Sequence, residues 1–226
     1  MLEFTMLTPV WLGMLLGTMW IGTSLLRGLE VTQVARDSAS LYSRGQDFTP
    51  AAYPNSSSSD NNILPMLAMA VGTVTNTGSG VITFSTVTYV GNSVCALAGF
   101  GVAGNNTPSN TGSHTASCTN YGYFVFTQQY QVGNSGLRAS NFGTPLAADM
   151  EPLSQQLQIP ILNYTQHSGD RAWTNGTTPF NLLPNPKEDG TDGYQSGQPV
   201  YIAEAFFTSI AAPGYTNGGT YAYAIF

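Results

Sequence analysis

Charged side chains are scarce in this sequence. They make up 8% of its 226 residues, about a third of the usual share of roughly 25%. The net charge is −6 and no stretch gathers lysine and arginine, so nucleic acid is not an expected partner. Ser, Thr, Asn, Gln, Gly and Tyr take the surface positions instead. A neutral polar surface can be buried against a copy of itself at low electrostatic cost, which favours an extracellular protein that packs side by side.

Side chains suited to catalysis or metal binding are also few. The chain has two histidines, His114 and His167. It has no Gly-x-Ser-x-Gly motif and no paired metal-ligand spacing, so neither a catalytic triad nor a zinc site is expected. Asp149 and Glu151 could form a carboxylate pair, but a solvated loop is the simpler interpretation. We therefore predict that the protein is not an enzyme and has no cofactor.

One acidic cluster runs from Lys187 to Gly193. Its carboxylates Asp189 and Asp192 are weak candidates for calcium ligands, because the segment lacks EF-hand spacing. An exposed turn is the expected structure there. The chain also contains N-x-Ser/Thr sequons, which are possible glycosylation sites but arise by chance in a sequence rich in Asn and Thr. These sequons begin at Asn55, Asn105, Asn163 and Asn175.

Cysteine is nearly absent, with Cys95 and Cys118 as the two in the chain. An even number in a chain that looks exported favours one disulfide, whereas two free thiols would fit a cytosolic protein. The segment between them is rich in Gly, Asn, Ser and Thr and is too polar to fold by burial alone. Cross-linking such a loop stabilises a fold by about 3 kcal/mol in the chain-entropy model.

The N-terminal segment lacks charge over a long run. Residues 4–26 contain no charged side chain and lie between Glu3 and Arg27. A bilayer core takes about 20 such residues as a helix. The run differs from a cleaved signal peptide, because no basic residues precede it and it is longer than the usual apolar core. It is therefore predicted to be a helix in a membrane or in the core of a filament.

The helical pattern continues past this run. Apolar and small residues recur at the 3.6-residue period, and Gly45 and Pro50 predict the end. One helix is therefore expected from about residue 8 to 44, on the order of 55 Å long. Its predicted buried face consists of Val31, Val34, Ala35, Ser38, Ala39 and Tyr42, and its polar face of Arg27, Glu30, Asp37 and Arg44.

Glycines recur in the uncharged half of this helix. Gly13, Gly17 and Gly22 are small positions that allow close approach of another helix, and the first two have GxxxG spacing. They are candidate helix-packing residues. The alternative is that they are ordinary lipid-facing glycines, which are frequent in membrane helices.

The rest of the chain predicts a β-rich head. A polar neck at 49–62 is followed by a short helix at about 61–72. Period-two patterns predict antiparallel strands. The first two strands are expected at Val81–Val90 and Tyr121–Val132, and the second is expected to place Phe124, Phe126, Tyr130 and Val132 on one face.

The later part of the head predicts one weak strand and a final hairpin. Leu157–Thr165 reads as an edge strand because it contains Pro160. The hairpin pairs Pro199–Ile210 with Thr220–Phe226. The predicted fold is α+β, with five or six strands and the two helices covering one face. Its parts are a helix at 1–48, of which 1–26 lies in the membrane or filament core, a neck at 49–62 and a head at 63–226.

Residues near both ends of the chain carry a resemblance. Leu2-Glu3-Phe4 followed by an apolar helix resembles the start of a mature type IV pilin, and more specifically of the TadE-like branch. The stretch Glu30–Gly45 resembles the helix continuation of that group, and Val200–Phe207 its strand near the C-terminus. The family pattern places the glutamate fifth in the processed chain, after a basic leader ending in glycine, and here it is third.

The resemblance implies a structural subunit that polymerises through its N-terminal helix into an extracellular filament. Glu3 would pair with the α-amino group of a neighbouring copy, at Met1, because an unpaired ion in a helix bundle is costly. The implied partners are copies of the chain, the pilus assembly machinery, a prepilin peptidase, and the inner membrane before assembly. The alternative is a membrane-anchored minor pilin or a surface module that binds glycan or a partner.

Overall fold

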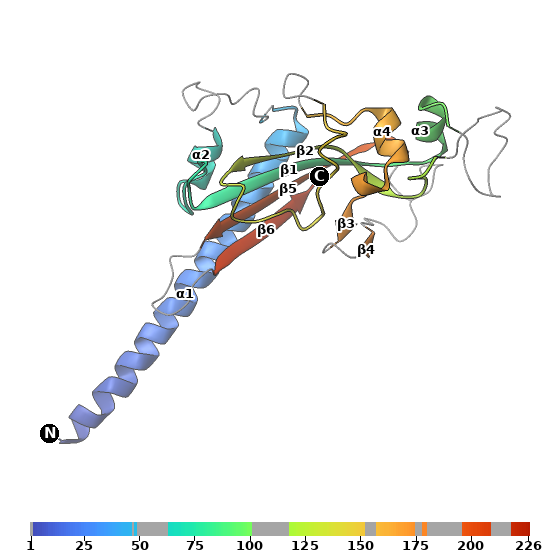
Figure 1. Ribbon diagram of the computed structural model, residues 1–226. Coiled ribbons are helices and arrows are strands. Elements are labelled where there is room, and N and C mark those ends of the chain that lie inside the picture. Colours follow the sequence, from blue (N-terminus) through green and yellow to red (C-terminus); the bar gives the residue numbers. More distant parts are fainter. Residues whose placement is uncertain are drawn as a thin grey trace.

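The fold combines one long helix with an antiparallel sheet, as predicted (Figure 1). Helix α1 spans Leu2–Ser43, and the sheet and the shorter helices form a head at its C-terminal end. The α+β class is therefore confirmed. The computed structural model describes residues 2–46, 48, 63–100, 118–151, 157–174, 178–179, 196–208 and 218–226.

Helix α1 begins earlier than predicted and ends where predicted. It starts at Leu2 rather than near residue 8. At the other end Gly45 adopts a left-handed backbone with φ +85°. This conformation suits glycine, which has no Cβ to clash. The N–H groups of Gly45 and Gln46 donate to the carbonyls of Tyr42 and Leu41 at 3.0 and 3.2 Å, which closes the last turn.

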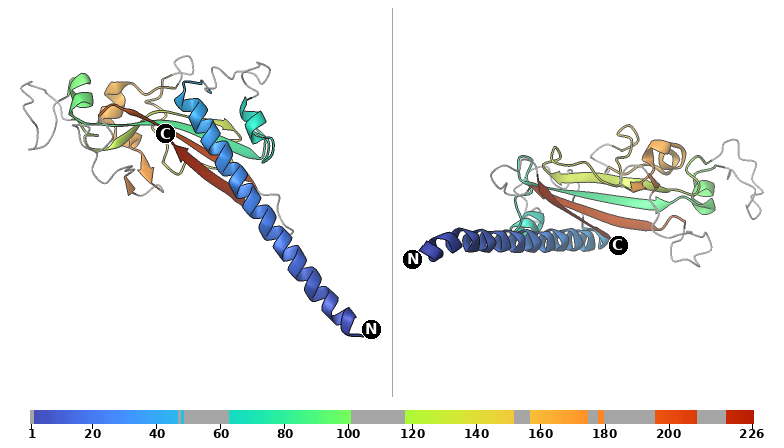
Figure 2. Two further views of the ribbon diagram at one scale, coloured as in Figure 1. Left: turned by 180° about the vertical axis from the view of Figure 1, so that it is seen from behind. Right: turned by 90° about the horizontal axis from the view of Figure 1, so that it is seen from below.

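The C-terminal half of α1 packs on the sheet. It crosses β5 (Pro199–Thr208) and β6 (Gly219–Ile225), and Figure 2 shows it running along one face of the sheet and far beyond it. The predicted buried face is confirmed. Six of its residues are at most 6% exposed: Val31, Val34, Ala35, Ser38, Ala39 and Tyr42.

The sheet has four strands in the order β2-β1-β5-β6, each antiparallel to its neighbour. Strand β1 (Gly80–Tyr89) is central and buried along its whole length, because both faces of the sheet are covered. Strand β2 (Phe124–Gly133) forms one edge. The predicted final hairpin is confirmed as β5 paired with β6. A two-stranded ribbon, β3 (Trp173–Thr174) with β4 (Thr178–Pro179), completes the strands in the described ranges.

Apolar clusters cover both faces of the sheet. On the α1 face, Tyr42 packs against Phe84, with ring centroids 5.2 Å apart, and Phe48 stacks on Phe84 at 4.8 Å. Helix α2 (Ile63–Ala68), shorter than the predicted 61–72, joins this cluster through Leu64. The opposite face holds a second cluster, which consists of Val87, Tyr89, Phe124, Phe126, Phe142, Ile159, Ala172, Val200 and Ile202.

A bulge in β2 overturns one prediction. Thr86 pairs with Gln128 and Val87 with Phe126, so Thr127 is an extra residue. Because side chains alternate along a strand, one extra residue moves those beyond it to the other face. Phe124 and Phe126 therefore lie on one face and Tyr130 and Val132 on the other, rather than all four together.

The predicted edge strand at Leu157–Thr165 is wrong. Only Gln158 forms a bridge there, to Gln128, and helix α4 follows at Ile161–Gln166. Pro160 caps the start of α4 with φ −58°, a position where its missing N–H costs nothing. Ile161 and Tyr164, three residues apart, then pack together against the disulfide cluster, a contact that the sequence pattern does not reveal.

Candidate functional site

The N-terminal half of α1 projects beyond the head (Figures 1 and 2). No residue in its apolar window is buried, and the helix is long and apolar enough to cross a membrane. The apolar side chains point in all directions, which is typical of a helix that is surrounded by lipid or by other helices. Those at least 53% exposed are Leu7, Val10, Trp11, Leu12, Met14, Leu15, Leu16, Met19, Trp20, Ile21, Leu25 and Leu26.

Three hydroxyl groups in this projecting half bond within the helix. Thr18 donates to the carbonyl three residues before it at 2.9 Å. Thr23 and Ser24 do the same at 2.9 and 2.8 Å. A polar group in an apolar medium needs such a partner, since water is absent. These side chains can therefore enter lipid or a helix bundle without a lost hydrogen bond.

The candidate packing glycines lie open on this half. A Cβ built at Gly13, Gly17 or Gly22 would meet nothing within 4 Å. No contact inside the chain therefore explains why these positions lack a side chain. Their predicted role in packing against another helix involves a second chain and stays a prediction.

Arg27 marks the point where the projecting half meets the head. One of its terminal nitrogens donates to the carbonyls of Val71 and Thr208 at 3.0 and 2.6 Å. This residue of the predicted polar face is partly buried against the head rather than fully in solvent. Arg27 fixes α1 both to the segment after α2 and to the end of β5.

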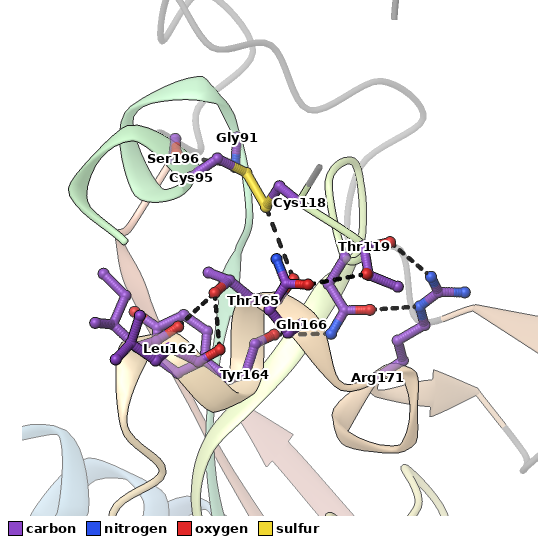
Figure 3. Close-up of a disulfide and its surroundings, with 12 residues drawn as sticks. Gly91, Cys95, Cys118, Thr119, Leu162, Tyr164, Thr165, Gln166, Arg171 and Ser196 are labelled. Carbon is purple, nitrogen blue, oxygen red and sulfur yellow. Dashed lines mark hydrogen bonds between the residues drawn. A yellow bond between two sulfur atoms is a disulfide. The ribbon is translucent and has the colours of Figure 1, made fainter. Parts of the chain in front are cut away.

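The predicted disulfide between Cys95 and Cys118 is confirmed (Figure 3). Cys95 lies in α3 (Asn92–Leu97), and the bond joins α3 to Cys118, close to α4. Both cysteines are buried in a cluster with Val90, Val94 and Val125. The disulfide thus lies at the end of the head away from α1 and has a structural role.

A buried amide fixes the residues after Cys118 to α4. The Asn120 side chain donates to the carbonyls of Tyr164 and His167, both at 2.7 Å, and accepts from Nε of Arg171 at 2.8 Å. Arg171 also donates to the Thr119 carbonyl at 2.8 Å (Figure 3). Its guanidinium lies over the Tyr123 ring, 3.8 Å from the centroid. The Arg171 guanidinium is therefore bound to the segment between Thr119 and Tyr123.

Asp149, His167 and Asp170 come together beside α4. One possible ligand atom of each lies within 4.8 Å of the others. Nδ1 of His167 is 2.6 Å from Oδ2 of Asp149. The sequence interpretation of Asp149 as part of a solvated loop is wrong, because its side chain is 6% exposed and pairs with His167. The interpretation failed because the partners lie 18 and 21 residues away, although the spacing of His167 and Asp170 around one short turn could have drawn attention to them.

Asp170 is the most unusual member of this cluster. It is fully buried in the 3-10 turn Ser168–Asp170. Its Oδ1 accepts the N–H of Leu146 at 2.9 Å, while Oδ2 is buried without a hydrogen-bond partner. Burial, together with the nearby Asp149 carboxylate, raises the pKa of Asp170 to about 6.

A third buried carboxylate, that of Glu204, fixes the loop after β2 to the sheet. It is 4% exposed and accepts from the Ser140 hydroxyl, from the Asn141 N–H at 2.8 Å and from the Tyr221 hydroxyl at 2.7 Å. Burial and the Glu204 charge raise the pKa of Tyr221. The hollow beside these groups has a volume of about 10 Å³, room for roughly one water, so it is not a substrate pocket.

Of the remaining predicted positions, Asn163 lies within the described residues and the others lie outside them. Asn163 lies in α4 and is half-buried, and the hydroxyl of Thr165 in its sequon donates to the Ile161 carbonyl at 2.6 Å. The other positions lie outside the described residues, as does the side chain of Glu3. They are Met1, Asn55, Asn105, His114, Asn175, Asp189 and Asp192.

Comparison of the chain with protein-family models, with curated proteins and with solved structures found no match. The resemblance to TadE-like pilins therefore stays a prediction from the quoted residues.

Proposed function

We propose that this protein is a structural pilin subunit that polymerises through α1 into an extracellular filament. The observation that carries the proposal is the projecting half of α1, which is apolar on every side and exposed. Burying a large apolar side chain stabilises by about 1.5–3 kcal/mol. For the 12 exposed apolar side chains between Leu7 and Leu26, this amounts to roughly 20 kcal/mol or more, so this half belongs in lipid or against other helices.

The continuity of α1 favours assembly over simple anchoring. An anchor requires about 20 apolar residues and no fixed relation to its domain. Here the apolar half continues without a break into the half seated on the sheet, and Arg27 fixes the junction. Packing of the projecting halves would therefore set the position of every head. The scarcity of charge lowers the cost of packing the heads side by side.

The glycines offer a test that separates helix packing from membrane residence. Gly13→Leu with Gly17→Leu keeps this half apolar, so the chain should still enter the inner membrane. The added side chains would prevent close helix approach, and we expect filaments to be lost. Thr18→Leu is the matched control, because it adds an apolar side chain about 100° around the helix. Filaments are counted by electron microscopy and the chain is followed by membrane fractionation.

The same measurements on the wild-type chain distinguish a filament subunit from a membrane-anchored binding module. Surface filaments built from this chain would support the proposal. A wild-type chain found only as a monomer in the inner membrane would overturn it and favour an anchored binding module. For such a module the exposed aromatics Tyr223 and Phe226, 52% and 51% exposed, are the first candidates for contact with a glycan. Filaments unchanged in the double-leucine variant would exclude the glycines from packing.

A further inference from the structure

The cluster of Asp149, His167 and Asp170 lies outside the surfaces that the proposed function uses. It joins the loop after β2 to the α4 region, on the side of the sheet away from α1. Its three side chains offer carboxylate oxygens and an imidazole nitrogen within 4.8 Å of one another. Asp149 and Asp170 are 6% and 0% exposed, whereas the His167 side chain is 48% exposed. A small ion could therefore reach the cluster from solvent past the imidazole.

The cluster sets two carboxylates against one imidazole. Oδ2 of Asp170 is buried without a donor, and a buried carboxylate oxygen left in this state is costly. The neighbouring Asp149 places a second carboxylate within 4.8 Å. The adjacent arginine, Arg171, does not compensate, because its guanidinium is bound to Asn120 and Thr119 and lies over Tyr123.

Backbone contacts hold the ligands in place independently of any ion. The Leu146 N–H donates to Oδ1 of Asp170 at 2.9 Å, and the Asp149 N–H donates to the Leu146 carbonyl at 3.0 Å. Gly169 packs under the Leu146 side chain, where an added Cβ would lie 2.6 Å from Cγ. The loop and the turn therefore meet closely, and they point two carboxylates at a common position.

We propose that Asp149, His167 and Asp170 form a binding site for a divalent transition-metal ion of the zinc type. A mixed set of imidazole nitrogen and carboxylate oxygens suits zinc, whereas calcium requires six to eight oxygen ligands. Three protein ligands leave a coordination position for water. The ion would take the place of the proton between Nδ1 of His167 and Asp149, and this proton would be released to solvent. Its charge would also compensate Oδ2 of Asp170.

Such an ion would have a structural effect. It would join the loop after β2 to the turn after α4, two segments that cover the second apolar cluster. Since the ion binds the folded chain in preference to the unfolded chain, it would stabilise the fold by mass action. This inference does not depend on filament formation.

The test uses the full chain in detergent, stripped of metal with a chelator and titrated with zinc chloride. Calorimetry should give one zinc per chain with release of protons, and the unfolding temperature should rise and saturate at that ratio. His167→Gln, Asp149→Asn and Asp170→Asn should each weaken zinc binding by at least about tenfold. Calcium chloride at the same concentrations should leave the unfolding temperature unchanged.

His114→Gln is the matched control, because it removes the other histidine of the chain. It should bind zinc as the wild type does. His167→Gln is the decisive variant, since an exposed side chain can be replaced without disturbing the core. The proposal is overturned if the wild type shows no saturable zinc binding, or if His167→Gln binds zinc with unchanged affinity. Loss of zinc binding in His114→Gln alone would overturn it as well.

Discussion

Arg27 lies at the boundary between the two environments of α1. On its N-terminal side the residues from Leu7 to Leu26 are exposed, and four residues beyond Arg27 the Val31 side chain is fully buried. The guanidinium bonds to two carbonyls that are 44 and 181 residues away in sequence. Charge-assisted hydrogen bonds of this kind are stronger than neutral ones. A single side chain therefore fixes where the projecting half ends and the head begins.

Replacing Arg27 should weaken the attachment of α1 to the head. In Arg27→Met the aliphatic stem keeps its volume, but the carbonyls of Val71 and Thr208 lose their donor. We expect a loss of about 2 kcal/mol in the free energy of unfolding, measured by urea denaturation in detergent. Arg36→Met is the control, because Arg36 is exposed on the same helix and should change stability by less than about 0.5 kcal/mol. Equal effects of the two variants would contradict this role for Arg27.

At the scale of elements, the disulfide joins α3 to the residues that lead into β2. The loop that it closes has a sequence separation of 23. Around it, Asn120 and Arg171 bond the same residues to α4 and to the turn that follows. The end of the head away from α1 thus depends on a covalent bond and a polar network more than on a large apolar core. Long-range apolar packing is concentrated where α1 crosses β5 and β6.

Removing the disulfide should therefore lower the free energy of unfolding by a measurable amount. Cys95→Ser with Cys118→Ser should lower the free energy of unfolding by about 3 kcal/mol, because the unfolded chain regains the entropy of the open loop. Urea unfolding of the oxidised wild type and the double variant gives this difference. The reduced wild type should match the double variant, and reductant should leave the double variant unchanged. A difference below about 1 kcal/mol would indicate that the polar network holds this end of the head alone.

At the scale of the whole molecule, the head and the projecting half of α1 are structurally separate (Figure 1). The head has its own core between α1 and the sheet and a second cluster on the opposite face. The apolar window of α1 contributes no buried residue to either. The apolar surface that the proposed function requires therefore lies in one part of the chain, and the apolar clusters of the head lie in the other.

A chain lacking residues 2–22 should fold as a soluble monomer. The deletion leaves Arg27 and its two acceptors in place but removes ten of the 12 exposed apolar side chains between Leu7 and Leu26. We expect an unfolding temperature within about 3 °C of the full chain in detergent and an intact Cys95–Cys118 bond. Light scattering and thermal unfolding test this, with the full chain diluted from detergent as the aggregating control. A shortened chain that aggregates or unfolds without cooperativity would show that the head needs the projecting half.

The sequence by itself determined the features that depend on local periodicity. The buried face of α1 from Val31 to Tyr42, its end at Gly45, the central strand and the β5–β6 hairpin all follow from patterns that repeat within a few residues. The disulfide followed from there being two cysteines in a chain that looks exported. The helix and strand predictions hold because neighbours along the chain decide them.

Only the tertiary structure decided the features that depend on distant partners. The bulge at Thr127 follows from the register against β1, and α4 packs against a disulfide formed elsewhere. The acceptors of Arg27 and the meeting of Asp149 with Asp170 depend on contacts across the fold. Hydrophobic periodicity is a local property of the sequence, whereas a buried polar side chain is placed by whichever distant partners satisfy it.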